Sequence, residues 1–333
     1  MRFCFIIEEQ YRHESMPMVI ANQLLRWGHA VDLLEPHETV TCLSDFGRQA
    51  YDACVLKTVS DGPGLSILEV AEAVGIPTIN NSRSIRLVRD KAVATAYALT
   101  HGLPTPHTYF VAHPRLLTQI PAEHYPLVIK PTNGSSCRGI YRLDNPAELD
   151  KLEIAETNRS FFLAQRYEEN KGFDVKIYVT GSEVFAVAKR SPLHPDVEVN
   201  KRPIPIAPEL RKLALHVGKV YGLDIYGLDV VETRHGPVVV DINDFPSFRQ
   251  VPDAVTLVSA YILYIARRAE LQRAARLERM RRRCRAMIEQ ALQRLSNLQN
   301  VQLLNGHTIL PDGARAQEKT AIDDAREEIR SIN

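Results

Sequence analysis

The sequence has few cysteines, and no two of them lie close together. An odd, scattered set argues against a disulfide framework and fits a reducing compartment. The spacings also lack the paired pattern of a zinc site. We therefore expect a cytoplasmic protein whose cysteines are all free thiols. The five are Cys4, Cys42, Cys54, Cys137 and Cys284.

Long apolar runs and a strong net charge are also missing. The first apolar run, Phe3–Ile7, has only five residues before Glu8, which is too short for a signal peptide or a membrane span. The net charge of +1 gives no bulk attraction to nucleic acid. With 45% apolar residues among 333, the chain is long enough for two or three packed units. The expectation is a soluble protein without a membrane span.

Strand and helix patterns alternate over residues 1–104, the first expected domain. Strands are predicted at Phe3–Ile7, Ala30–Leu34, Tyr51–Leu56 and Ile76–Ile79. Helices are predicted at Met16–Trp27, Leu65–Val74 and Ser84–His101. This alternation predicts a doubly wound parallel sheet, with ligands at the carboxyl ends of its strands.

A second domain is expected over residues 105–262, in two parts. Residues 105–168 form a central part, with strands at Leu127–Ile129, Ile140–Leu143 and Phe161–Tyr167 and a helix from Pro146. Residues 169–262 are expected to form an antiparallel sheet, with a hairpin turn at Gly181-Ser182, a long loop over 191–206 and a helix at Pro208–Tyr221. The fold class is thus mixed α/β, with a parallel and an antiparallel sheet.

The strongest chemical signal is a pair of strands ending in GLDVVE and VVVDIN. Asp241 and Asn243 are two residues apart, so they share one strand face, and Asp229 lies on the neighbouring strand. Carboxylates in apolar strands need a compensating ion or partner. Oxygen ligands of this kind suit magnesium, although polar faces of an ordinary hairpin would look similar.

Phosphate-binding residues are suggested at three further places. Lys130 ends an apolar strand, and a Gly/Ser-rich loop follows whose backbone N–H groups suit phosphate oxygens. Lys91 begins a helical stretch, and Arg190 closes the strand EVFAVAKR. Taken singly, such a loop is often an ordinary turn, and such cations are often solvated surface charges. The loop residues concerned are Gly134, Ser135, Ser136 and Gly139.

In this order, the four signals resemble the ATP-grasp superfamily, in its RimK-type branch, over roughly residues 1–262. The resemblance implies that ATP and Mg²⁺, or Mn²⁺, are the cofactors. It implies that Lys91 and Lys130 grip phosphates, that GSSCRG is a lid, and that Asp174 lies near the nucleotide. It makes Lys130 and Arg190 the catalytic residues, with Arg190 on the transferred phosphoryl group, and Asp229, Asp241 and Asn243 the metal ligands. Adenine would be read at Gln165, Arg166, Tyr167 and Glu168.

The chain departs from that family pattern at two positions. Lys176 stands where the ligases usually keep an arginine, and Asp241 stands where they usually keep a glutamate. Aspartate shortens the reach of the ligand and keeps its charge.

The acceptor substrate has two interpretations, both anionic. A RimK-type ligase would activate a carboxylate and let an amine displace the phosphate. An inositol phosphate kinase of the same fold is the alternative, because DVKIYVTG, AKRSPLHPD and DINDFPSF resemble that family. An inactive ATP-grasp scaffold is a third reading. Candidate acceptor-binding residues, each of which is also an ordinary surface charge by itself, are Arg12, Lys57, Asn200, Lys201 and Arg202.

The third expected part is an Arg-rich helical tail over residues 263–333. Residues 266–296 contain ten arginines against three glutamates. Their apolar residues at alternating three- and four-residue steps suit a partner helix, either of the body or of a second copy. Nucleic-acid binding is the sharper alternative, although aromatic residues for base stacking are missing there. The apolar positions are Leu277, Met280, Cys284 and Met287.

Overall fold

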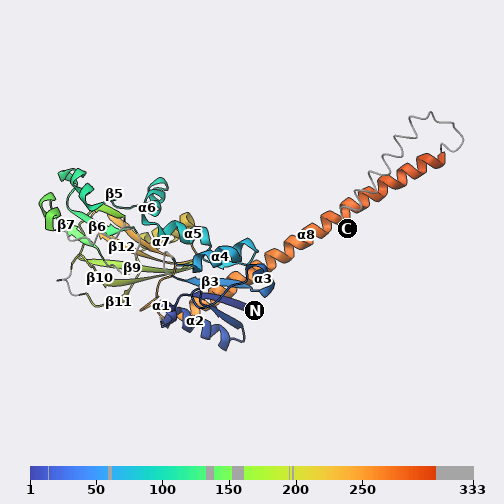
Figure 1. Ribbon diagram of the computed structural model, residues 1–333, viewed down its shortest axis with the longest axis horizontal. Helices are drawn as coiled ribbons and strands as arrows, with labels where there is room; N and C mark the ends of the chain where they lie inside the picture. The colour runs from blue at the N-terminus through green and yellow to red at the C-terminus, as the bar shows by residue number, and fades with distance from the viewer. Residues whose placement is uncertain are drawn as a thin grey trace. The chain divides into compact units, whose positions relative to one another are not determined.

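The computed structural model describes residues 1–13, 15–58, 62–132, 139–151, 161–194, 196 and 199–304. Its first compact unit is Met1–Ala266, and a second begins at Arg267. Three sheets make up the first unit, one parallel and two antiparallel, as Figure 1 shows. The predicted mixed α/β class is therefore confirmed. In the described part of the chain, no helix combines the length and apolarity needed to cross a membrane.

The N-terminal sheet is parallel, with strand order β2-β1-β3-β4. Its central strand β1 is buried on both faces, as expected of a parallel sheet under helices. Phe3 and Phe5 face the cluster that contains helix α2, while Cys4 and Ile6 face the cluster that contains α4. The elements here are β1 (Arg2–Ile7), α1 (Glu9–Arg12), α2 (Ser15–Arg26), β2 (Ala30–Leu34), α3 (Leu43–Phe46), η1 (Gly47–Gln49), β3 (Ala53–Lys57), α4 (Gly64–Ala73) and β4 (Thr78–Ile79).

The single helix predicted over Ser84–His101 is wrong, because the chain forms two helices there. These are α5 (Ser82–Arg89) and α6 (Lys91–Thr100), and Asp90 between them has extended backbone angles. The Asp90 carboxylate accepts hydrogen bonds from the backbone N–H groups of Ala92 and Val93, which caps α6. This break places Lys91 in the first turn of a new helix.

The central part forms a small antiparallel sheet of order β5-β8-β6-β7 over its own apolar core. The helix predicted from Pro146 is only a short 3₁₀ segment, Pro146–Lys151. The elements are β5 (Thr108–Val111), η2 (Pro114–Gln119), η3 (Ala122–His124), β6 (Leu127–Pro131), β7 (Tyr141–Leu143), η4 (Pro146–Lys151) and β8 (Phe162–Arg166).

The third sheet has five antiparallel strands in the order β11-β10-β9-β12-β13. One face, with Val175 and Ile177, packs against helix α7. On the other face, Tyr178 and Ile225 pack in the core of the N-terminal sheet. Polar residues of the same face, among them Lys176 and Asp229, lie toward the opposite end of these strands. The elements are β9 (Phe173–Thr180), β10 (Glu183–Arg190), β11 (Arg202–Ile204), α7 (Pro208–Tyr221), β12 (Ile225–Thr233) and β13 (Gly236–Asn243).

Strand β11 corrects the prediction of an irregular loop over 191–206. Its three residues pair with β10 through Ile204, Pro203 and Arg202. The prolines of this segment argued against a strand, but β11 is an edge strand, where a proline without an N–H is tolerated.

Helix α8 (Ala254–Leu304) runs through both compact units. Its first turns belong to the core, where Val258, Ile262 and Ala266 are fully buried. Within the second unit Leu277 and Met280 are about half exposed. Residues 305–333 of the predicted tail lie outside the described residues. Self-association and nucleic-acid binding by the tail stay predictions.

We expect the second unit to be dispensable for folding of the first. A chain that ends after Glu270 keeps Val258, Ile262 and Ala266 in place and should unfold within a few degrees of the full-length protein. A chain that ends before Val258 loses buried apolar side chains worth roughly 1.5–3 kcal/mol each and should unfold much earlier. Thermal unfolding of the two truncations checks this. Equal melting of both would show that the start of α8 is not part of the core.

Candidate active site

A cleft that is open to solvent lies where the small sheet meets the five-stranded sheet. A cleft with apolar walls and a few converging polar groups is a usual place for a small molecule or cofactor. Both sheets and the first turn of α6 contribute to its wall. The charged and polar side chains of the lining are Lys91, Lys130, Gln165, Arg166, Tyr167, Glu168, Asn170, Asp174, Lys189, Ser191, Asp229 and Asp241.

The polar side of the cleft is one face of the five-stranded sheet. In the register of the strands, Asp174 lies opposite Lys189, Lys176 lies opposite Asp229, and Asp229 lies opposite Asp241. Because directly opposed residues of antiparallel strands point to the same face, these five side chains converge. Four neighbouring strands thus place three carboxylates and two ammonium groups together.

Asp229 is the most constrained of these carboxylates. Its oxygens lie 2.8 Å from Lys176 Nζ and 2.7 Å from Lys189 Nζ, and the residue is only 8% exposed. Burial alone would raise the pKa of Asp229, but the two ammonium groups outweigh it and hold the pKa well below its usual range. Asp229 therefore stays ionised and fixes both lysines.

Asp174 has the opposite electrostatic balance. Burial raises the pKa of Asp174, and the opposing effects of Lys189 and a hydrogen bond from Ser191 do not cancel it. Lys189 Nζ is 3.8 Å from Asp174, compared with 2.7 Å from Asp229. The shared lysine therefore favours Asp229 over Asp174.

The two predicted phosphate lysines both enter the cleft from other elements. Lys91 Nζ lies 2.5 Å from Asp241 Oδ1, an ion pair between α6 and β13. Lys130, at the end of β6, is 8% exposed and donates a hydrogen bond of 2.7 Å to the Val240 carbonyl. Two ammonium groups from distant parts of the chain thus meet at the same stretch of β13.

Two carboxylates of the cleft are the candidate ligands for a metal ion. Asp174, Asp229 and Asp241 share a sheet face, but in the described ranges no three acidic, histidine or cysteine side chains lie close enough together to hold a metal ion among them. Asp229 and Asp241 supply two opposed carboxylates, and Asn243 lies two residues further along β13 but does not line the cleft. Two carboxylates suit Mg²⁺, which takes its other ligands from phosphate and water. The residues present therefore fit that ion.

The segment predicted to read adenine lines the other side of the cleft. Gln165 is buried in β8, and its side-chain amide donates to Thr108 Oγ1 at 2.9 Å. The Tyr167 ring lies under the Arg142 guanidinium, 4.2 Å from its centre, and the tyrosine hydroxyl contacts His194. Of the predicted lid, Gly134, Ser135 and Ser136 lie outside the described residues. Gly139 is exposed, with φ of +74°, a conformation that favours glycine.

Lys189, and not Arg190, faces the cleft, which corrects the placement of the predicted catalytic arginine. Successive residues of a strand point to opposite faces, so the neighbours Lys189 and Arg190 cannot share one. Arg190 is exposed opposite Phe173 and, in the part of the chain that the structure describes, is not among the lining residues. Counting the alternation from Asp174 across the hairpin would have selected Lys189.

The predicted acceptor-binding residues are mostly placed elsewhere. Arg12 pairs with Glu35 at the surface, and Lys57 Nζ donates to the Phe245 carbonyl at 2.7 Å. Asn200 and Arg202 are exposed and, in the described structure, do not line the cleft.

Lys201 is the candidate acceptor residue that lies closest to the polar cluster. It precedes β11 by one residue, and the β10–β11 register continued by one residue places it opposite Lys189. Burial lowers the pKa of Lys201, and the nearby charges of Arg249, Lys189 and Lys176 lower it further. Lys201 therefore lies within electrostatic reach of these three cations.

Comparison with known proteins gives a consistent result. The model of the RimK-like ATP-grasp domain matches residues 88–261. A "Probable alpha-L-glutamate ligase" of Legionella pneumophila (strain Corby) is 27% identical over 221 residues, which are 62% of this chain and 72% of that protein. A protein of the same name from Vibrio vulnificus (strain YJ016) is 25% identical over 288 residues, 79% of this chain and 94% of the other.

Two solved structures show the same fold at low identity. A RimK domain protein of the ATP-grasp type from Sphaerobacter thermophilus is 17% identical with a TM-score of 0.62, over 79% of this chain and all of the other. The ATP-grasp ligase PsnB, in complex with its minimal precursor, Mg and ADP, is 18% identical with a TM-score of 0.61, over 80% and 98%. None of these four proteins is named a kinase, so the inositol kinase alternative gains no support from them. The predicted resemblance and fold are confirmed, and the chain belongs to the RimK-like ATP-grasp family.

Proposed function

We propose that this ATP-grasp ligase joins the amine of glutamate to a carboxylate acceptor through an acyl phosphate. The observation that carries the proposal is the convergence of Lys91, Lys130, Asp229 and Asp241 in one cleft. Glutamate is the first candidate because the two relatives described above bear the name of a glutamate ligase. That substrate comes from their names, whereas the cleft supports the chemistry.

The reaction has two steps, phosphorylation of the acceptor carboxylate and displacement of the phosphate by the amine. A carboxylate oxygen of the acceptor attacks the γ-phosphorus of ATP, so that a P–O bond forms and the bond to ADP breaks. The amine nitrogen then attacks the acyl carbon, the C–O bond to phosphate breaks, and the amine loses a proton. Phosphoryl transfer of this kind depends on positioning and on neutralising negative charge. Bound Mg²⁺ would neutralise part of that charge, held by Asp241 and Asp229; use of Mn²⁺ stays a prediction.

The cations of the cleft have distinct roles in this scheme. Lys91 and Lys130 hold phosphate oxygens, because their ammonium groups lie beside Asp241 and the Val240 carbonyl on β13. Lys189 is fixed by Asp229 and contacts the transferred phosphoryl group in place of the predicted arginine. Lys201 and Arg249 extend the positive charge beyond Lys189, which supports an acceptor that carries several carboxylates.

Product analysis with defined acceptors tests the proposal. The chain is incubated with ATP, Mg²⁺, L-glutamate and short peptides that end in glutamate. A ligase releases ADP and free phosphate in equal amounts, requires the amine for turnover, and lengthens the peptide by one glutamyl residue. Phosphate that remains on the acceptor without any need for an amine would show a kinase, and the proposal would then be wrong.

The lysines give a quantitative prediction for ATP binding. Lys130→Ala or Lys91→Ala removes one charge-assisted contact, worth roughly 1.5–3 kcal/mol, so the Kd for ATP should rise about tenfold or more. Lys171→Ala is the matched control, because Lys171 pairs only loosely with Glu232 at the surface, at 3.5 Å. Titration calorimetry measures all three. A variant at position 91 or 130 that binds ATP like the control would remove that lysine from the site.

A further inference from the structure

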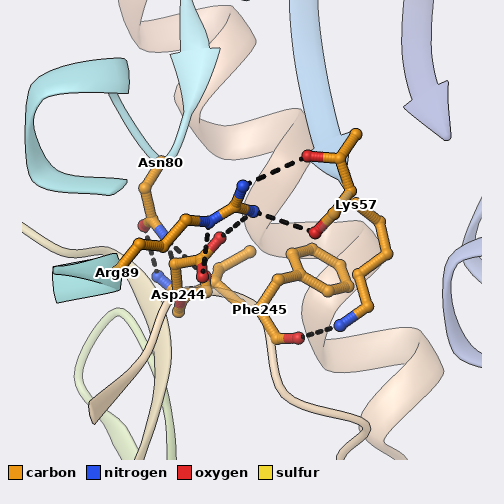
Figure 2. A network of polar contacts seen from close by, with 7 residues as sticks. Lys57, Asn80, Arg89, Asp244 and Phe245 are labelled. Atoms are coloured by element: carbon orange, nitrogen blue, oxygen red, sulfur yellow. Dashed lines mark hydrogen bonds and ion pairs between the residues drawn. The ribbon is translucent and has the colours of Figure 1, made fainter. Parts of the chain in front are cut away.

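A network of polar contacts holds the chain just after β13, as Figure 2 shows. The Arg89 guanidinium binds both carboxylate oxygens of Asp244, with Nε–Oδ1 and Nη2–Oδ2 distances of 3.2 and 2.9 Å. The Asn80 side-chain amide donates to the Asp244 carbonyl at 2.6 Å, and Lys57 Nζ donates to the Phe245 carbonyl. Three side chains of the N-terminal part therefore hold two consecutive residues.

The network is largely buried, and Arg89 and Asn80 are themselves held by further hydrogen bonds. The side chains of Arg89 and Asp244 are 9% and 15% exposed. Arg89 also donates to Thr58, both to its hydroxyl and to its carbonyl, at 3.2 Å each. Asn80 is fully buried and accepts from the backbone N–H groups of Asp224 and Ile225. A two-point contact of this kind fixes orientation as well as distance, because the guanidinium fork matches a carboxylate.

The network lies at the end of β13, the strand that carries Asp241 into the cleft. β13 is an edge strand, and β12 is the one strand that pairs with it in the described sheet. Asp244 directly follows Asn243, the last residue of β13, and is three residues from Asp241. After this point the backbone is irregular, with Phe248 and Gln250 at positive φ. The contacts to Asp244 and Phe245 therefore support the strand end that carries Asp241.

We propose that Arg89 is a positioning residue for the metal ligand of β13: through Asp244 it fixes the strand end that aims Asp241. The inference rests on the proposed function, since it concerns the ion that Asp241 would hold. Partners that orient a metal ligand matter for affinity, and their loss typically costs about 10–100-fold in metal binding.

The test compares Arg89→Met with Arg86→Met on the same helix, α5. Arg86 pairs with Glu69 at the surface, where the two side chains are 63% and 39% exposed, so it is a matched control. Calorimetry measures the Kd for ATP with Mg²⁺ and with EDTA. We expect Arg89→Met to keep the EDTA value and to lose about tenfold or more of the affinity that Mg²⁺ adds. Arg86→Met should keep both values, and Arg89→Lys, which retains charge without the fork, should be intermediate.

The outcomes separate this inference from the proposed function. An Arg89→Met protein that keeps the full gain from Mg²⁺, or that loses affinity equally with and without it, would overturn the positioning role. Asp244→Asn, which removes the charge and keeps the shape of the network, gives the same comparison if Arg89→Met does not fold. A parent chain whose ATP affinity gains nothing from Mg²⁺ would refute the proposed function itself.

Discussion

Asp241→Ala should lower turnover by about 10²-fold or more and leave the fold intact. Asp241 lines the cleft, is 28% exposed at its side chain, and pairs with Lys91 from another element. Loss of a preorganised charge at the reacting group typically lowers kcat by about 10²–10³-fold. Because the pair is partly solvated, its removal should cost less than about 1 kcal/mol of stability.

Steady-state assays over a Mg²⁺ titration, with urea unfolding beside them, measure both parts of this prediction. Glu183→Ala is the control, because Glu183 is an exposed acid in the same sheet, at the start of β10. It should match the parent in rate and stability. Parent-like turnover of Asp241→Ala at ordinary Mg²⁺ concentrations would remove Asp241 from the metal site.

Asp229→Ala, in contrast, should destabilise the fold itself. It would leave the ammonium groups of Lys176 and Lys189 in a buried site without the carboxylate that both contact. Breaking a buried ion pair by removal of one partner costs about 3–5 kcal/mol. Urea unfolding measures the change. A triple variant, Asp229→Ala with Lys176→Met and Lys189→Met, should recover part of the loss because no charge is left stranded.

The loss in Asp229→Ala should depend on pH with a definite sign. The pKa of Asp229 is lower in the folded chain than its unfolded value of about 3.9. Its stabilisation is therefore fully present above about pH 4 and disappears as the pH falls through the lower, folded pKa. The parent and variant should converge in stability in acid. A difference below about 1 kcal/mol at pH 7, or one that grows in acid, would contradict the ion-pair account.

Strand alternation explains why much of the site could be predicted from sequence. The two-residue period of a strand predicts Asp241 and Asn243 on one face with Asp229 beside them, and the register of β12 and β13 has this arrangement. For β10 the family pattern points to Arg190, whereas the same two-residue period puts Lys189 on the face that lines the cleft. Alternation identifies a face reliably once one residue of that face is known.

Other features depend on contacts that no sequence spacing reveals. Arg89 meets Asp244 across 155 positions, and Lys57 meets the Phe245 carbonyl across 188. Lys57 looked like a substrate cation because it ends a parallel strand, where ligands often bind. The structure instead gives its ammonium group a backbone partner. Such roles follow from how the N-terminal sheet packs beside β13, which a local pattern does not contain.

A structure with Mg²⁺ and a non-hydrolysable ATP analogue would test the central claim most directly. We predict phosphates between Lys91 and Lys130, and a metal ion about 2.0–2.1 Å from a carboxylate oxygen of Asp241. The base should lie against the segment from Gln165 to Glu168. A nucleotide bound outside this cleft, or a metal ion that contacts neither Asp229 nor Asp241, would contradict the account.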